Sequence, residues 1–262
     1  RDERDLAEWV AHHLAVGFEH VFLYDNQSVV PVREVLAAAV AEGSVTAIDW
    51  PGGTRQLSAF DDGIRRFGPQ ARWLAFFDAD EYLVPKRGVS EWLALLDRAQ
   101  HRGAGALQIC WRMFGSSGRL ERPSGGELVV EAYDRRVPDD YKPNGHTKAV
   151  VQTHAALGAG PDPHHFRLVH GVGAVTETLQ VQLGPMTPGA PSYDFAALHH
   201  YFTKSRADYA EKVARGRPDV AGARRGWAEF EDLETWATVE DRSACEWAEA
   251  TRATLARWAA AT

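Results

Sequence analysis

The chain has little cysteine and no long apolar run, and these two features exclude several classes of protein. Two cysteines among 262 residues, Cys110 and Cys245, cannot form a disulfide framework or a zinc-finger ligand set. Such sparse cysteine suits a reducing compartment, and we expect a cytoplasmic protein. No run of about 18 apolar residues is present, so the sequence contains no candidate membrane span. It also lacks a signal-peptide pattern and an initiator methionine, and we expect a fragment or processed form of a longer protein.

Basic residues are fewer than acidic residues. The sequence has 29 Lys and Arg residues against 36 Asp and Glu residues, which gives a formal net charge of −7. Proteins that bind nucleic acid normally present excess positive charge to the phosphates, so we expect no nucleic-acid partner. The hydrophobic fraction of 45% and the charged fraction of 25% are ordinary for a globular chain, and the length suits one or two domains.

Helix-like and strand-like segments alternate over the first 115 residues. Apolar residues recur at helical spacing in 6–14, 32–40, 57–67 and 92–96, and strand-like apolar runs occupy 20–24, 45–50, 73–77 and 106–111. This alternation predicts βαβ units and an α/β fold with a mostly parallel sheet flanked by helices. From 116 to 191 the pattern changes to short β-like runs such as 127–133 and 149–153, and helical segments return after 201.

The strongest local signal is a group of acids at the end of the apolar run 73–77. Asp78, Asp80 and Glu81 follow that run directly, and ligands of open parallel sheets bind beyond the carboxyl ends of the strands. On extended backbone, Asp78 and Asp80 point to the same side. Crowded carboxylates repel one another unless positive charge neutralises them, and a hard divalent cation with a bound diphosphate supplies it. The alternative interpretation is a solvated acidic turn.

A second polar cluster, residues 25–28, follows the run 20–24 and is expected at the same edge of the same sheet. Taken alone, Asp25, Asn26 and Ser28 are typical of an ordinary turn. Together the two clusters predict a nucleotide pocket with a metal at its diphosphate end. Arg65, on the helix before the acidic run, is a candidate to reach that diphosphate, although exposed arginines are more often only surface charge.

A set of short motifs in a fixed order resembles a glycosyltransferase family that is related to family 2 and to family 92. The motifs span about residues 2 to 216. They include Glu8-Trp9, His12-His13, Leu23-Tyr24-Asp25-Asn26-Gln27-Ser28, Gln56, Asp78-Ala79-Asp80-Glu81-Tyr82, Trp111-Arg112-Met113-Phe114 and His200-Tyr201-Phe202-Thr203-Lys204-Ser205.

The resemblance implies a GT-A-like, Rossmann-like fold over residues 1–216, followed by a helical extension over 217–262. The nucleotide-sugar half would cover about 1–115 and the acceptor half about 116–216. The implied reaction moves a sugar from a nucleotide-sugar donor, with a UDP-sugar favoured, to a hydroxyl acceptor such as a glycan, with inversion. The implied cofactor is Mn²⁺ or Mg²⁺.

The resemblance also assigns roles to single residues. Among the donor-binding residues, Asp25 would contact the base, Asp78 the ribose and Lys204 the diphosphate. The other donor-binding candidates are Asn26, Ser28, Gln56 and Arg65. Metal ligands would be Asp78 and Asp80, with His200 as the first choice for a further ligand and His164 as the second. A structural histidine is the alternative for both His200 and His164.

The acceptor side is less defined. Trp111 and Phe114 are candidates for an apolar platform under a sugar ring, and ordinary core aromatics are the alternative. Removing a proton from the acceptor hydroxyl requires a base. Glu81 and Glu177 are the two candidates, and for Glu177 an exposed structural carboxylate is the favoured alternative.

Two other functions fit parts of the pattern. A domain that binds a sugar nucleotide or a glycan without transfer is one, although the intact Asp78-Ala79-Asp80 argues against it. A phosphatase of the haloacid-dehalogenase type is the other, with Asp78 as nucleophile and Asp80 as acid and base. Such phosphatases generally have Thr or Val where this chain has Tyr82, and their acidic strand normally opens the sheet.

Overall fold

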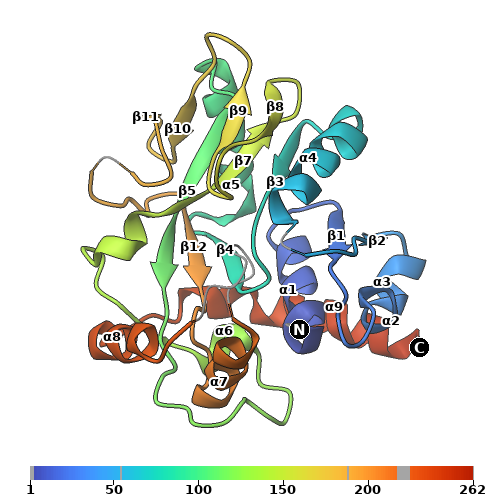
Figure 1. The fold of residues 1–262 in the computed structure, drawn as a ribbon, viewed down its shortest axis with the longest axis vertical. Helices are drawn as coiled ribbons and strands as arrows, with labels where there is room; N and C mark the ends of the chain where they lie inside the picture. Colours follow the sequence, from blue (N-terminus) through green and yellow to red (C-terminus); the bar gives the residue numbers. More distant parts are fainter. Residues whose placement is uncertain (1–2, 54, 188, 217–224, 262) are drawn as a thin grey trace. The chain divides into compact units, whose positions relative to one another are not determined.

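The computed structural model describes residues 3–53, 55–187, 189–216 and 225–261. The chain divides into two compact units, each assembled from separate stretches of sequence (Figure 1). The first unit contains 1–54, 114–136 and 201–262, and the second contains 55–113 and 137–200. Neither unit coincides with the consecutive halves 1–115 and 116–216 that the sequence predicts.

The second unit is built around a seven-stranded sheet. Its helical elements are α4 (Gln56–Phe67), η1 (Gly68–Gln70), α5 (Gly88–His101) and η2 (Lys142–Gly145). Its strands are β3 (Trp73–Ala75), β4 (Glu81–Pro85), β5 (Ala106–Met113), β7 (Thr147–Gln152), β8 (Ala156–Ala159), β9 (Phe166–Leu168), β10 (Ala174–Thr176), β11 (Val181–Gln182) and β12 (Ala196–His200). The predicted runs 73–77, 106–111 and 149–153 thus correspond to β3, β5 and β7.

The seven-stranded sheet is mixed rather than mostly parallel. Its path runs β11-β10-β5-β12-β4, and β7 joins β5 to β3. Within the described residues, β5 pairs in parallel with β10 and β12, whereas the pairings β10–β11, β12–β4, β5–β7 and β3–β7 are antiparallel. The prediction of a mostly parallel sheet is wrong here because the segment 137–200 returns through the sheet as β7 and β12.

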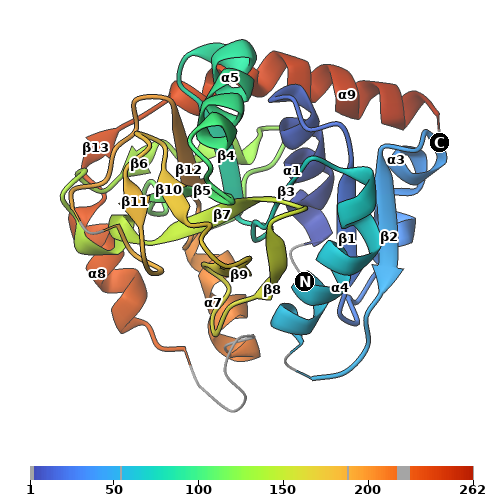
Figure 2. The same cartoon turned by 90° about the horizontal axis from the view of Figure 1, so that it is seen from above.

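Helix α4 covers one face of this sheet because its apolar residues recur every three or four positions. Phe60 packs against Phe76 and Phe166, with ring centroids 4.8 and 5.9 Å apart, and Ile64 packs on the same buried cluster. Helix α5 lies against β4 and β5 (Figure 2). This packing holds the central strands in register and leaves residues at their ends to form the site.

The first unit holds most of the helices. Its elements are α1 (Glu3–Ala15), β1 (Val21–Asp25), α2 (Val32–Val35), α3 (Ala37–Ala41), β2 (Val45–Asp49), α6 (Val129–Ala132), β6 (Arg135–Arg136), α7 (Arg206–Arg215), α8 (Ala228–Trp236), β13 (Val239–Glu240), η3 (Ser243–Trp247) and α9 (Ala248–Ala260). Helix α9 packs along α1. The predicted helical extension over 217–262 corresponds to α8, η3 and α9, with residues 217–224 and 262 outside the described part.

Two expectations for the first unit need correction. Strands β1 and β2 pair with each other in parallel and form a separate two-stranded sheet, so Asp25 does not end a strand of the sheet that leads to Asp78. The β-like run 127–133 is helical at α6, where the Glu8 carboxylate accepts the Val129 N–H at 2.8 Å. Among the described residues, no helix combines the length and apolarity that a membrane crossing requires.

Candidate active site

Strand register places four predicted or chemically distinctive side chains on one face of the seven-stranded sheet. Glu81 of β4 lies opposite His200 of β12, and His200 lies opposite Met113 of β5. Trp111 shares the face of Met113 because alternate residues of a strand point the same way. Lys148 of β7 is paired with Ile109 and so shares this face as well. Residues as far apart in sequence as Glu81 and His200, at a separation of 119 positions, therefore build one cluster.

A buried lysine lies between two of the acids. The Lys148 Nζ atom is 2.6 Å from Asp78 Oδ2 and 3.4 Å from Glu81 Oε1, and the side chains of Lys148 and Glu81 have 0% exposure. Burial alone would lower the pKa of Lys148, but the charges of Asp78 and Glu81 outweigh it and raise that pKa. The lysine is therefore a permanent cation inside the acidic cluster.

The remaining contacts fix both acids in orientation. Gln56, the first residue of α4, donates from Nε2 to Asp78 Oδ1 at 2.8 Å. Glu81 accepts the Asp78 backbone N–H at 2.8 Å and the Trp111 indole N–H at 2.8 Å. Burial acts to raise the pKa of Glu81, whereas the charge of Lys148 and the Asp78 N–H act to lower it. Asp78 keeps 39% side-chain exposure, so it is the acid of this pair that a ligand can reach.

Asp80 faces His200. The Asp80 Oδ1 atom is 3.5 Å from His200 Nε2, with side-chain exposures of 14% and 7%. The ring of His200 lies 4.5 Å from that of Trp111. A carboxylate and an imidazole are donors that Mn²⁺ accepts. In the part of the chain that the structure describes, no group of three His, Cys, Asp or Glu side chains is arranged to hold a metal, so a cation here would also need donors from a ligand or from water.

Two further histidines surround Trp111. His146 and His164 have ring centroids 5.1 and 5.3 Å from that of Trp111. His164 Nδ1 lies 2.9 Å from the Thr147 carbonyl oxygen, and because a carbonyl only accepts, Nδ1 carries the proton. Burial, reinforced by the charge of Lys148, lowers the pKa of His164. His164 is thus held as a neutral imidazole whose Nε2 bears a lone pair.

Glu177 and Arg65 belong to the second unit and have other partners. Glu177 is 1% exposed, not exposed as expected, and its carboxylate accepts from the Ser192 hydroxyl and from the backbone N–H groups of Asp194, Phe195 and Ala196. It therefore fixes the segment that leads into β12. Arg65 is 74% exposed and forms an ion pair with Asp62, one turn earlier on α4.

The predicted donor residues 25–28 lie in the first unit. Asp25 accepts the Ser28 N–H at 2.8 Å and the Val32 N–H at 2.9 Å, and it thereby closes the turn that starts α2. Burial would raise the pKa of Asp25, but these backbone hydrogen bonds lower it. Asn26 donates to the carbonyls of Trp50 and Gly52 at 2.7 and 2.9 Å. The contacts of Asp25 stabilise a local turn, and those of Asn26 tie this turn to the segment that follows β2.

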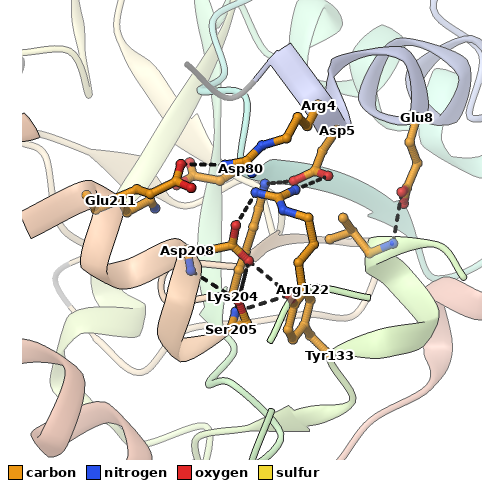
Figure 3. A network of polar contacts seen from close by, with 12 residues as sticks. Arg4, Asp5, Glu8, Asp80, Arg122, Tyr133, Lys204, Ser205, Asp208 and Glu211 are labelled. Atoms are coloured by element: carbon orange, nitrogen blue, oxygen red, sulfur yellow. Dashed lines mark hydrogen bonds and ion pairs between the residues drawn. The ribbon is translucent and has the colours of Figure 1, made fainter. Parts of the chain in front are cut away.

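Lys204 lies in a network of charges within the first unit (Figure 3). Its Nζ atom is 2.5 Å from Asp5 Oδ2, and Asp5 also binds Arg122 at 2.7 Å. Arg122 in turn pairs with Asp208, which forms a capping box with Ser205 at the start of α7. Lys204, 2% exposed, therefore links α1 to α7 in this structure.

Phe114 does not offer the surface that its predicted role requires. It is fully buried in the first unit, with its ring centroid 4.9 Å from that of Tyr201. A buried ring has no free face on which a sugar could stack, so Phe114 is a core residue here. Trp111, which is partly exposed, remains available to a ligand.

The structure thus separates the predicted site residues into groups. Those that it brings together in the second unit are Gln56, Asp78, Asp80, Glu81, Trp111, His164 and His200. Sequence reasoning missed Lys148 and His146. The only sequence signal for Lys148 was a charged residue directly before the strand-like run 149–153, where an exposed position is the usual explanation.

Comparison with known proteins now adds to this geometry. A family model described as glycosyltransferase family 92 matches residues 2–152, more than half of the chain. The chain belongs to glycosyltransferase family 92. This confirms the family 92 part of the resemblance that the motifs indicate. His164 and His200 lie beyond the matched residues, and the structure alone places both beside Trp111, with His200 also facing Asp80.

Three curated relatives carry the same family name. The chain is 29% identical over 171 residues to a glycosyltransferase family 92 protein of Oryza sativa subsp. japonica, 26% over 170 residues to one of Ricinus communis and 28% over 177 residues to one of Arabidopsis thaliana. Each alignment covers 64% of this chain. The chain spans only 28–30% of the length of these relatives.

Proposed function

We propose that this chain carries the catalytic site of a metal-dependent glycosyltransferase of GT-A type. The reaction moves a sugar from a nucleotide-sugar donor, with UDP favoured as the nucleotide, to a hydroxyl of a glycan or similar acceptor, with inversion at the sugar carbon. In this reaction the acceptor oxygen forms a bond to the sugar, the sugar–phosphate bond breaks, and the nucleoside diphosphate leaves.

One observation carries the proposal. Asp80, from the short loop that also carries Asp78, faces His200 from a strand more than 100 residues later, in a chain of glycosyltransferase family 92. A phosphatase would use Asp78 as a nucleophile, but both of its oxygens have strong donors, and no observation favours that function.

Asp80 and His200 fit a divalent cation. Their donor atoms face each other. A carboxylate oxygen and an imidazole nitrogen are ligands that suit Mn²⁺, whereas metals that prefer thiolate ligands would find none in these two residues. When bound, the cation would stabilise the negative charge that develops on the departing diphosphate. His164, whose Nδ1 is engaged with Thr147, is not needed as a ligand in this proposal.

The other residues of the cluster bind or orient the donor. Asp78 is exposed enough to accept a hydrogen bond from a ribose hydroxyl, and Gln56 holds it in place. Trp111 lies beside His200 and contributes the apolar surface for a sugar. Glu81 is fully buried and both of its oxygens accept hydrogen bonds, so we assign it the role of orienting Asp78 and Trp111 rather than that of a base.

A nucleotide-release assay tests the proposal. The protein is incubated with UDP-sugars and GDP-sugars, with Mn²⁺ and with a chelator, and free nucleoside diphosphate is measured. We expect release that depends on the metal and increases when a suitable acceptor is added. Nucleotide binding without turnover would support a binding domain, and phosphate release from a simple ester would support a phosphatase.

A further inference from the structure

The three carboxylates of the acid cluster can carry more negative charge than one divalent cation balances. Asp78, Asp80 and Glu81 lie within four positions, and in the described residues Lys148 contacts two of them. Lys148 comes from β7, on the other side of β5 from the strand that carries His200. The protein thus supplies its own cation for Asp78 and Glu81, and Asp80 is the acid that faces the imidazole.

The contacts of Asp78 leave no good position for a metal on that carboxylate. An ammonium group at 2.6 Å occupies the direction of Oδ2, and an amide N–H at 2.8 Å occupies that of Oδ1. A divalent cation on either oxygen would lie next to these donors and would be repelled by the charge of Lys148. A neutral hydroxyl donor has no such conflict and can use a remaining lone pair of Asp78.

We propose that Lys148 is a positioning residue that reserves Asp78 for the donor nucleotide and leaves the cation to Asp80 and His200. This inference rests on the proposed function. It divides the two aspartates of the loop by their neighbours, since Lys148 and Gln56 donate to Asp78, whereas Asp80 faces His200. Lys148 acts through Asp78, since its own side chain is fully buried and cannot touch a ligand.

Two separate binding measurements test this division. Mn²⁺ binding to the protein is followed by the electron paramagnetic resonance signal of free Mn²⁺, and UDP or GDP binding is measured by calorimetry at saturating Mn²⁺. We expect Lys148→Met to weaken nucleotide binding at least about tenfold, and to change Mn²⁺ affinity less than about twofold. Asp80→Asn should instead weaken Mn²⁺ binding at least about tenfold. The matched control is Lys142→Met, an exposed lysine of η2, which should change neither.

A double-mutant cycle separates a positioning role from a structural one. If Lys148 acts through Asp78, the variant Asp78→Asn/Lys148→Met should bind nucleotide no more weakly than Asp78→Asn alone. Additive losses would overturn the inference. If Lys148→Met does not fold, Lys148→Arg keeps the charge but moves its contact point, and it should still weaken nucleotide binding while Mn²⁺ binding stays as in the wild type.

The outcomes distinguish this inference from the function on which it rests. If the unaltered protein binds neither Mn²⁺ nor a nucleotide, the proposed function fails. If it binds both, and the Lys148 variants bind nucleotide as the wild type does or lose Mn²⁺ binding instead, the role of Lys148 fails and the proposed function stands.

Discussion

Asp25 is the last residue of β1 and Asp78 follows β3, and the two acids differ in which groups donate to them. Asp25 accepts from the backbone of its own turn, at Ser28 and Val32. Asp78 accepts from two side chains, Gln56 and Lys148, which are 22 and 70 residues away. The local backbone satisfies Asp25, which fixes a turn, whereas Asp78 is held by side chains from distant segments and keeps 39% side-chain exposure, so that a ligand can still reach it.

The same contrast sorts the other buried acids. Glu8 and Glu177 accept mainly from backbone N–H groups, as Asp25 does. Asp80, like Asp78, faces a side chain, that of His200. The comparison therefore predicts that variants of Asp25, Glu8 and Glu177 affect stability. Variants of Asp78 and Asp80 should affect binding and turnover.

The largest expected effect is the loss of activity in Asp80→Asn. Removing the charge that faces His200 should lower metal-dependent nucleotide release about 1,000-fold, because the proposed cation site uses that carboxylate. The melting temperature should remain close to that of the wild type, since Asp80 is not part of a core. Asp97→Asn, a half-exposed acid on α5, is the control. A fully active Asp80→Asn protein would contradict the metal assignment.

Glu177→Ala should be the most destabilising of the backbone-bound variants. It leaves the hydroxyl of Ser192 and three backbone N–H groups without their acceptor, so we expect the free energy of unfolding to fall by about 3–4 kcal/mol. Urea unfolding measures it. Glu177→Gln should lose less, because an amide oxygen still accepts. If Glu177→Gln is stable and yet loses activity as Asp80→Asn does, Glu177 is the base after all.

Glu8 predicts a pH dependence of stability. Burial raises its pKa from an ordinary 4.5 to about 7, so the folded state binds this proton more tightly than the unfolded state. The stabilisation is complete below pH 4.5 and is lost as pH rises toward 7, by about 3 kcal/mol in total. Glu8→Gln should lack this loss in urea unfolding at pH 5 and pH 8. Equal pH slopes for the two proteins would refute the assignment.

Asp25→Ala should have the smallest effect. Losing the acceptor for the Ser28 and Val32 N–H groups should cost about 1–2 kcal/mol in the free energy of unfolding. Because the pKa of Asp25 is lowered, its contribution has the opposite pH dependence to that of Glu8 and disappears as pH falls below its ordinary value of 3.8. If Asp25→Asn folds normally but raises the donor KM strongly, Asp25 binds the donor as the sequence predicts.

The sequence predicts local elements well in this chain, and it predicts the site only in part. Helical spacing locates α1, α4 and α5, and the apolar run 106–111 locates β5, because those signals lie within a few neighbouring residues. The acids of residues 78–81 are also visible, since an apolar run precedes them.

What the sequence could not provide depends on strand pairing. Lys148 reaches Asp78 only because β7 pairs with both β3 and β5, and Glu177 finds its donors 15 to 19 residues later, beside β12. Partners of this kind leave no periodic pattern in either segment. The mixed order of the sheet was missed for the same reason.

The place of β12 between β4 and β5 also has a consequence for synthesis in the cell. The ribosome completes β4 and β5 about 80 residues before it delivers β12, so the nascent sheet has an unfilled slot with exposed strand edges for that interval. His200 is the last residue of the strand that fills the slot. The proposed site is thus completed by the same late event that closes the sheet, and we expect a chain stopped before it to lack the His200 side of that site and to be prone to aggregate.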